Sequence, residues 1–247
     1  MLIVGNWKAY VDSLEKAKRL YAVAKRLSAA GHHEIVIAPS APHLGFLAGG
    51  NRSSVEFAAQ DISSSLGGAA TGEVTAGVVA NLGATYVIVG HSERRAQGES
   101  DALVLEKVQH ALAQGLVPIL CIGERERDAE AHYLNTLRAE IAAVFAPLSP
   151  KQRLQVVIAY EPIWAIGKSA SEAITPADLN EMILYIRKVL ADYLPGRASA
   201  KVRVIYGGSV EPGNIRALAA GSGIEGFLVG HASTDAQTFG ALVKAVT

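Results

Sequence analysis

The feature that most constrains this sequence is a series of short apolar runs, rich in Val and Ile, that alternate with helix-like segments. There are eight runs: LIVGNW, EIVIAP, VEFAAQ, YVIVGH, VPILCIG, QVVIAY, VRVIYGG and GFLVGH. Continuous apolar runs of this length are typical of strands that are buried on both faces. Such strands occur in parallel sheets that are covered by helices on their outer side.

The segments between the runs carry helical patterns, which are clearest in residues 13–27, 100–115, 129–145 and 175–194. In residues 100–115, one apolar stripe alternates with positions that we expect to be polar; the stripe is Leu103, Val104, Val108 and Leu112, and the polar positions are Asp101, Glu106 and Lys107. Thr175 and Pro176 are a typical helix start. The weakest unit is the second, in which HLGFLAGGNRSS predicts a poor helix.

Eight strand and helix units in 247 residues favour a closed (β/α)8 barrel over a doubly wound open sheet, which is the alternative fold. The composition is 50% hydrophobic and 19% charged, and it does not change abruptly along the chain. We therefore predict an α/β protein in which residues 1–247 form a single barrel domain.

Charge and cysteine content exclude several classes of function. Lys plus Arg and Asp plus Glu number 23 each, so no net field attracts nucleic acid or an anionic membrane. No apolar run is as long as a membrane span. Cys121 is the only cysteine, which excludes an internal disulfide and suits a reducing compartment. We expect a cytoplasmic protein without nucleic-acid or membrane partners.

Functional side chains of such a barrel gather where the strands end, because the loops after the strands form its working face. The runs end on a set of polar or small residues: Asn6, Lys8, Gln60, His91, Cys121, Glu161, Gly207 to Ser209, Gly230 and His231. Any one of these is most simply an ordinary loop residue. Their joint occurrence at seven of the eight strand ends favours a site.

Two of these ends predict phosphate binding. YGGSV and LVGHAS place glycine where a backbone must approach a ligand closely, and a short helix start follows each of them. The loops after the seventh and eighth strands commonly hold phosphate in barrels. Lys8, alone most simply a solvated lysine, then becomes a candidate for neutralising substrate charge.

His91 and Glu161 are the candidates for proton transfer. A helix start after His91 would favour a neutral imidazole, which can donate to a carbonyl oxygen. Pro162 biases Glu161 toward extended geometry, so that its carboxylate is aimed from the strand end, as a general base requires. A structural ion pair is the alternative role for this glutamate.

The remaining candidates are weaker. His32 and His33 lack spaced partner ligands, so we expect no metal site there. Cys121 is most simply a small core residue, and GERERD, residues 123–128, is most simply a solvated approach to a helix. The sequence contains neither a dinucleotide fingerprint nor a P-loop, so no cofactor is expected.

Seven motifs, taken in order, resemble the triosephosphate isomerase family over essentially the whole length of the chain. They are GNWK, AQDISSSLGGAATGEVTAG, VIVGHSERR, CIGE, AYEPIWAIG, YGGSV and GFLVG. The resemblance implies a homodimeric TIM barrel. It also implies an enzyme that interconverts dihydroxyacetone phosphate and glyceraldehyde 3-phosphate without metal or cofactor.

Carried over residue by residue, the resemblance implies roles for the strand-end groups. Glu161 resembles the base that moves a proton between two substrate carbons, and His91 resembles the neutral electrophile that stabilises the enediolate. Asn6 and Lys8 would support that charge, and Glu93 resembles a family glutamate near the lysine.

The resemblance also implies a lid, a phosphate site and a dimer loop. PIWAIG resembles the closing lid, which would bring the Gly167 N–H to the phosphate and exclude water. Ser209, Gly230 and His231 would supply further phosphate contacts. SLGGAATGE resembles the loop through which Thr71 enters the partner subunit, although its composition also fits an ordinary surface loop.

Two departures from the family pattern bear on substrate range. The lid continues as Lys168 to Ala173 in place of the usual Thr-Gly-Lys. His231 stands where the family has a glycine, and a histidine would be strained there if the backbone had a positive φ. A related isomerase for four-carbon sugar phosphates and a catalytically silent phosphate-binding barrel are therefore the alternatives.

Overall fold

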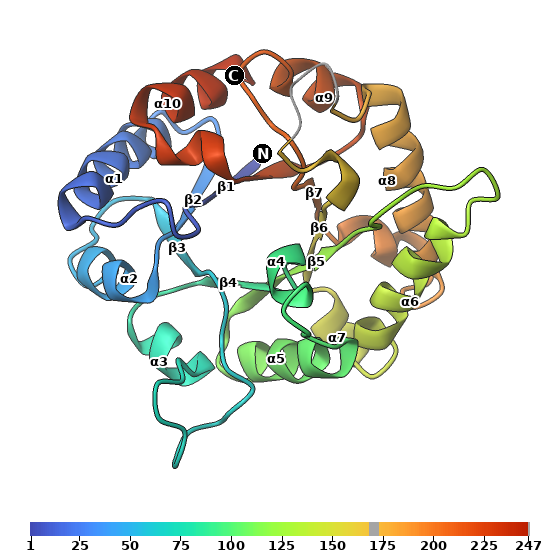
Figure 1. The fold of residues 1–247 in the computed structure, drawn as a ribbon, viewed down its shortest axis with the longest axis horizontal. Coiled ribbons are helices and arrows are strands. Elements are labelled where there is room, and N and C mark those ends of the chain that lie inside the picture. The colour runs from blue at the N-terminus through green and yellow to red at the C-terminus, as the bar shows by residue number, and fades with distance from the viewer. Residues whose placement is uncertain (168–172, 247) are drawn as a thin grey trace.

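The computed structural model describes residues 1–167 and 173–246, and it shows a closed barrel of eight parallel strands (Figure 1). The strands follow one another around the barrel in chain order, and β1 also pairs with β8, which closes the ring. They are β1 (Leu2–Asn6), β2 (Glu34–Ala38), β3 (Glu56–Ala59), β4 (Tyr86–Val89), β5 (Val117–Ile122), β6 (Val157–Tyr160), β7 (Val204–Tyr206) and β8 (Gly226–Val229). The predicted barrel is confirmed, and the open sheet is excluded.

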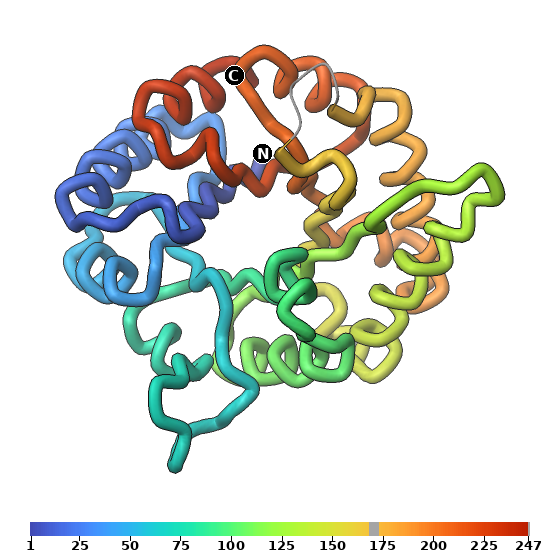
Figure 2. The backbone as a smooth tube through the Cα atoms, viewed as in Figure 1, coloured from blue at the N-terminus to red at the C-terminus, as the bar shows by residue number. Residues whose placement is uncertain are grey.

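The helices form an outer ring around the strands (Figure 2). The α-helices are α1 (Leu14–Ala29), α2 (Ala41–Ala48), α3 (Ala76–Asn81), α4 (Ser92–Arg95), α5 (Asp101–Ala113), α6 (Tyr133–Phe145), α7 (Pro150–Arg153), α8 (Pro176–Ala191), α9 (Ile215–Gly221) and α10 (Ala236–Ala245). Three 3-10 helices are η1 (Ile163–Ala165), η2 (Gly196–Lys201) and η3 (His231–Thr234). The short α4 lies in front of the strands and inside this ring (Figure 1).

Helix starts agree with local sequence chemistry. Ser13, Ser100 and Thr175 each accept a backbone N–H of the first turn of α1, α5 and α8. The second unit forms only a short helix, α2, which ends at Ala48 within the quoted segment and has no side-chain hydrogen bond at its N-cap, in line with the expected poor helix. Its Leu44 and Leu47 are buried, and this packing outweighs the weak local propensity.

Apolar side chains form two layers, as expected when alternate strand residues face the barrel interior and the helices. The interior layer includes Val4, Val36, Ile88, Ile119 and Leu228. The larger outer layer packs the strands against the helices. Among the described residues, no helix is long and apolar enough to cross a bilayer.

One position of α5 differs from the pattern-based expectation. Lys107 is only 3% exposed, although the helical pattern predicts a polar surface position. Its ammonium group contacts Asp61, at 2.8 Å, and Glu99. These carboxylates belong to other segments, so only the fold reveals why a lysine is buried here.

Candidate active site

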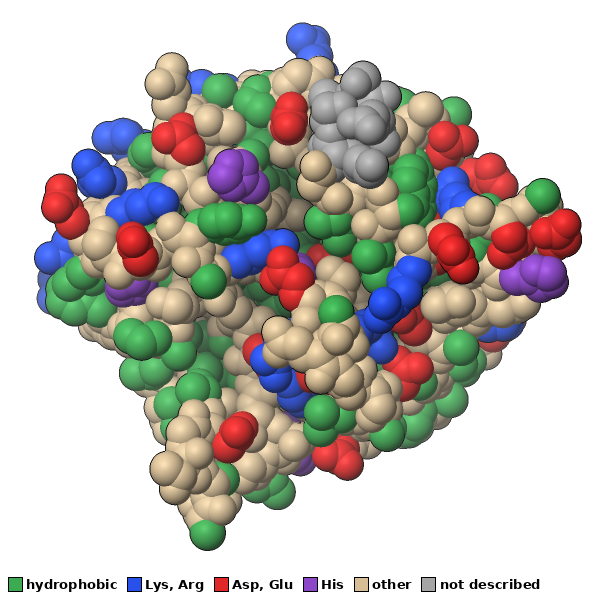
Figure 3. Space-filling view, viewed as in Figure 1, with side chains coloured by type: hydrophobic (Ala, Val, Ile, Leu, Met, Phe, Trp, Pro, Cys, Tyr) green, Lys and Arg blue, Asp and Glu red, His purple; other side chains and the backbone are tan. Residues whose placement is uncertain are grey.

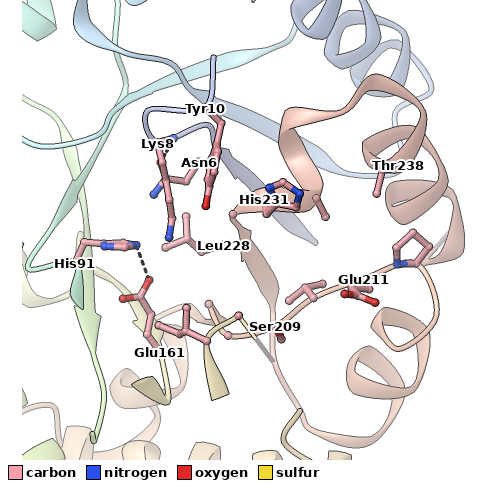
Figure 4. A pocket seen from close by; sticks show the side chains of 18 residues that line it. Asn6, Lys8, Tyr10, His91, Glu161, Ser209, Glu211, Leu228, His231 and Thr238 are labelled. Carbon is pink, nitrogen blue, oxygen red and sulfur yellow. Dashed lines mark hydrogen bonds and ion pairs between the residues drawn. The ribbon is translucent and has the colours of Figure 1, made fainter. Parts of the chain in front are cut away.

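A cavity of about 490 Å³, which we call the main cavity because most of the predicted strand-end groups line it, lies over the carboxyl ends of the strands. Figure 3 shows a recess near the centre of this face, beside basic and acidic side chains that touch each other. Lys8, His91 and Glu161 converge at one end of the cavity, while Ser209 and His231 lie toward the other (Figure 4). Most of the predicted strand-end groups therefore share one site, whereas Gln60 and Cys121 do not line this cavity.

The loop after β1 holds Lys8 in a specific and unfavourable backbone conformation. Lys8 has a φ of +47°, a region that residues other than glycine seldom occupy. Its backbone N–H donates to Asn6 Oδ1 at 3.0 Å, and its carbonyl accepts from Gln60 Nε2 at 2.9 Å. Asn6 is 4% exposed. Asn6 and Gln60 thus fix the direction in which the lysine leaves the strand.

The ammonium group of Lys8 is paired with Glu93 of α4. Lys8 Nζ lies 2.7 Å from Glu93 Oε1. Partial burial alone would raise the pKa of Glu93, but the hydrogen bond and charge of Lys8 outweigh burial and lower it. Glu93 is therefore charged at neutral pH, and it holds the ammonium group of Lys8, which lines the cavity.

His91 caps the N-terminus of α4 and is 6% exposed. Its Nδ1 accepts the backbone N–H of Glu93 at 3.2 Å. A ring nitrogen that accepts a hydrogen bond carries no proton, so in the neutral ring Nε2 is the protonated atom. That Nε2 lies 3.4 Å from Glu161 Oε1. The local fold therefore presents a His91 N–H donor to the cavity.

Glu161 follows β6 and is 2% exposed. Its Oε2 accepts the backbone N–H of Ser92 at 3.3 Å, while Oε1 faces His91. Gly207, at the end of β7, lies against the Glu161 side chain: a Cβ there would come within 2.8 Å of Glu161 Cγ. The absence of a side chain at Gly207 thus makes room for the carboxylate.

The other end of the cavity is lined by the loops after β7 and β8, and by Gly167 of the predicted lid. Gly167 has a φ of +73°. His231 begins η3 and is not among the described residues with positive φ, so the expected strain at this position is absent. Its ring instead packs edge-on against Tyr10, with the ring centroids 5.1 Å apart.

The interpretation of residues 123–128 as a solvated approach is wrong for Glu124, which is 1% exposed. Its Oε1 accepts hydrogen bonds from the Tyr160 hydroxyl at 2.8 Å, from Trp164 Nε1 at 2.8 Å and from Arg127 Nε at 2.9 Å. Trp164 belongs to PIWAIG, so Glu124 fastens the start of the predicted lid. Glu124 lies two residues after the end of the fifth strand, and this position is the sequence signal that could have identified it.

Cys121 is buried in the barrel interior, as predicted. Burial raises the pKa of its thiol, and the neighbouring Glu161 carboxylate raises it further through its charge and a hydrogen bond. The thiol is therefore protonated at neutral pH. It borders the candidate base as a neutral group and is no nucleophile.

Thr71 does not join the cavity of its own chain. It is exposed on a loop between β3 and α3 that projects from the ring of helices (Figure 1). Leu66 of the same loop is 78% exposed. Within the predicted segment Lys168 to Ala173, residues 168–172 lie outside the described residues.

The described residues contain one group with the spacing of three metal ligands, Asp128, Glu130 and His132. All three are exposed and none lines the main cavity. Exposed acidic groups of this kind are common without a metal.

Comparison with known proteins supports what the geometry suggests. A sequence model of the family described as triosephosphate isomerase matches residues 1–246. The chain belongs to the triosephosphate isomerase family. It is 40% identical to the triosephosphate isomerase of Symbiobacterium thermophilum, over 99% of this chain and 96% of that protein.

Two other triosephosphate isomerases are equally similar. That of Moorella thermoacetica is 40% identical over 98% of this chain and 97% of its own length. That of Thermus thermophilus is 40% identical over 99% and 98%. The similarity covers nearly the whole chain in each case.

Proposed function

We propose that this protein interconverts dihydroxyacetone phosphate and D-glyceraldehyde 3-phosphate by proton transfer through an enediolate. The observation that carries the proposal is the pairing of a buried carboxylate, Glu161, with a protonated imidazole nitrogen, His91 Nε2, 3.4 Å away at one cavity end. A base and a neutral donor are the two groups that proton abstraction next to a carbonyl requires.

In this mechanism, Glu161 removes a proton from the carbon next to the substrate carbonyl. His91 Nε2–H donates to the carbonyl oxygen as it gains negative charge, and Lys8 and Asn6 support that charge. His91 gives its Nε2 proton to the former carbonyl oxygen and takes the proton of the neighbouring hydroxyl group, so that the second oxygen becomes the carbonyl as Glu161 returns its proton to the neighbouring carbon. Triosephosphate isomerases are the standard example of a glutamate base working with a neutral histidine.

Substrate must replace the contacts that Glu161 makes in the free protein. Its two carboxylate oxygens face His91 Nε2 and the Ser92 N–H. A substrate whose carbonyl takes over the His91 donor would free Oε1 for the carbon-bound proton. The electrophile and the base thus hold each other in place until substrate separates them.

The phosphate group would bind at the opposite end, to backbone N–H groups of Gly167, Ser209, Gly230 and His231. These residues all line the cavity. Backbone N–H groups at the start of short helical turns suit an anion. With the phosphate group held at this end, the substrate carbons would point toward Glu161.

We also propose a cytoplasmic homodimer. Supporting the dimer is the projecting loop that carries Thr71 and the exposed Leu66, which the chain's own barrel leaves uncovered. Thr71 would enter the partner subunit beside its Asn6 and Lys8. A lone reduced cysteine suits the cytoplasm.

A coupled assay of the purified protein with glyceraldehyde 3-phosphate tests the function, with Glu161→Ala as the control. We expect rapid turnover in the wild type and its near-complete loss in the variant. An assay with a four-carbon ketose phosphate is run in parallel. Turnover of that substrate alone would contradict the proposal, as would a folded wild type that is inactive on both.

A further inference from the structure

Two ionisable residues that line no part of the main cavity lie directly behind its proton-transfer end. Arg95 belongs to α4 and Glu140 to α6, and their side chains are 12% and 10% exposed. Burial of charged groups is costly unless they are paired and hydrogen-bonded. Their partners are backbone groups next to His91 and next to Glu161.

On one side, Arg95 holds the backbone at the end of β4. Its Nε donates to the carbonyl of Gly90 at 2.9 Å, and Gly90 directly precedes His91. Its Nη1 lies 2.5 Å from Asp101 Oδ1, in the first turn of α5. The carbonyl before the candidate electrophile is therefore tied to a guanidinium group that is itself anchored.

On the other side, Glu140 holds the backbone at the end of β5. Its Oε2 accepts the N–H of Gly123 at 2.9 Å. Gly123 touches the backbone of the candidate base, since a Cβ there would lie 1.8 Å from the Glu161 carbonyl oxygen. The preceding residue, Ile122, accepts the Glu161 N–H at 2.8 Å. Any shift of the Gly123 peptide would therefore move Glu161.

The two halves meet where Arg95 Nη1 lies 3.7 Å from Glu140 Oε1. A continuous chain of contacts thus runs from Gly90 through Arg95, Glu140 and Gly123 to the Glu161 backbone. We infer that Arg95 and Glu140 are positioning residues that set the separation between the His91 and Glu161 backbones. This inference rests on the proposed function for its kinetic consequence, but its structural part stands on the contacts alone.

The inference matters because the two reacting side chains come from different strands, β4 and β6. The strand between them, β5, contributes no side chain that we assign to the reaction. The backbone at the end of β5 therefore separates the two, and Glu140 links this backbone to Arg95 of α4. Errors of about 1 Å in such a separation can cost on the order of 100-fold in rate.

Arg95→Lys tests the first half, because a lysine retains the charge but lacks the fork that reaches Gly90, Asp101 and Glu140 together. We expect kcat to fall about 10- to 100-fold, with KM and the inhibition constant of inorganic phosphate changed less than threefold. The matched control is Arg153→Lys. Arg153 binds the carbonyls of Phe145 and Tyr193 away from the cavity, and we expect its kcat to stay within twofold.

Glu140→Ala and Glu140→Gln test the second half. Alanine leaves the Gly123 N–H without an acceptor, whereas the glutamine amide oxygen can still accept it. We expect a kcat loss for alanine like that of Arg95→Lys, and recovery by glutamine to within about threefold of wild type. If Arg95→Lys fails to fold, this pair decides the question.

Activity is compared per folded protein, measured by circular dichroism, at a temperature well below each variant's unfolding midpoint. An unchanged kcat in folded Glu140→Ala, or equal losses in its alanine and glutamine variants, would reduce the pair to a structural role and overturn the inference. A larger effect on phosphate inhibition than on kcat would overturn it as well.

Crystal structures of Arg95→Lys and Arg153→Lys separate failure of this inference from failure of the proposed function. We expect the separation of the His91 and Glu161 Cα atoms to change in the first variant and not in the second. An unchanged separation in Arg95→Lys would overturn the inference whatever the wild-type activity. An inactive wild type with a changed separation would overturn only the proposed function.

Discussion

The two ends of the cavity are built by different means. At the proton-transfer end, Asn6, His91 and Glu161 are side chains with exposures of 2 to 6%, each fixed by hydrogen bonds. At the phosphate end, Gly230 and His231 offer backbone groups and are more exposed. A reacting group must be held in one geometry and one protonation state, whereas a doubly charged anion needs only N–H groups that face it. The second end should therefore tolerate side-chain changes that the first does not.

The largest effect that we predict is at the electrophile. His91→Gln removes the Nε2–H donor whose protonation is set by the Glu93 N–H. We expect kcat to fall roughly 100- to 1000-fold, the usual cost of losing one donor to a developing oxyanion. Steady-state kinetics in both directions measure it. A change confined to KM would contradict the role of His91.

At the base, Glu161→Asp withdraws the carboxylate by about one bond length while keeping its charge. We expect a loss on the order of 100-fold in kcat, because proton transfer depends steeply on alignment. Single-turnover kinetics separate this loss from slower product release. A neutral result would mean that another group is the base.

Glu140, behind the proton-transfer end, should make the stability of the folded protein depend on pH. Burial raises the pKa of Glu140 to about 7, against an ordinary value of 4.5, despite the opposing charge of Arg95. The folded state therefore binds the proton of the Glu140 carboxyl group more tightly than the unfolded state does. Proton binding stabilises the folded state below pH 4.5, and this stabilisation is lost as the pH rises from 4.5 to 7. We expect that loss to be about 3 kcal/mol in the free energy of unfolding.

Urea unfolding at fixed protein concentration, from pH 4.5 to 8, measures this effect in the wild type and in Glu140→Gln. The wild type should lose stability relative to the variant as the pH rises. Parallel profiles would show that Glu140 is not protonated in the folded state over this range.

Gly207→Ala tests whether the two ends are as separate as their construction suggests. Gly207 belongs to the phosphate end by sequence, yet a Cβ there would meet Glu161 Cγ at 2.8 Å. We expect about a 10-fold loss in kcat through displacement of the base, with phosphate inhibition nearly unchanged. A loss of phosphate affinity with normal kcat would instead assign Gly207 to the anion.

The smallest effect should be at His231. Its side chain packs against Tyr10, and its expected contribution to the anion is a backbone N–H that His231→Ala retains. We expect kcat and KM both to stay within about threefold of wild type. A larger change in KM would show that the imidazole ring itself contacts the substrate, and the comparison between the two ends would fail.

The barrel could be predicted from the sequence because strands that are buried on both faces must be apolar throughout. The eight apolar runs show this requirement directly in the sequence. Sequence reasoning also placed Asn6, Lys8, His91 and Glu161 at strand ends, and these ends meet in any closed parallel barrel. The resemblance to a known family supplied their proposed roles. Strand-end position alone assigns no chemistry.

The buried charges could not be predicted in the same way. Lys107 and Glu124 look like surface residues because the local pattern gives no information about partners that are distant in sequence. Asp61 lies after β3 and Trp164 after β6, so each pairing forms only when the neighbouring strand and helix units have packed together. The tautomer of His91 is likewise set by a hydrogen bond that only the coordinates reveal.

Closure of the ring through β1 and β8 has a consequence for how the protein is made. Leu2 is paired with Gly226, so the strand synthesised first waits for the one synthesised last. Contacts so distant in sequence form slowly, and an unpaired strand edge can pair with other chains meanwhile. Asn6 and Lys8 follow the first of the eight strands, so they can meet the β8 loop only after all eight strands have been synthesised. The candidate pocket is therefore completed in one late step of folding, and once β1 and β8 have paired, none of the eight described strands has an open edge.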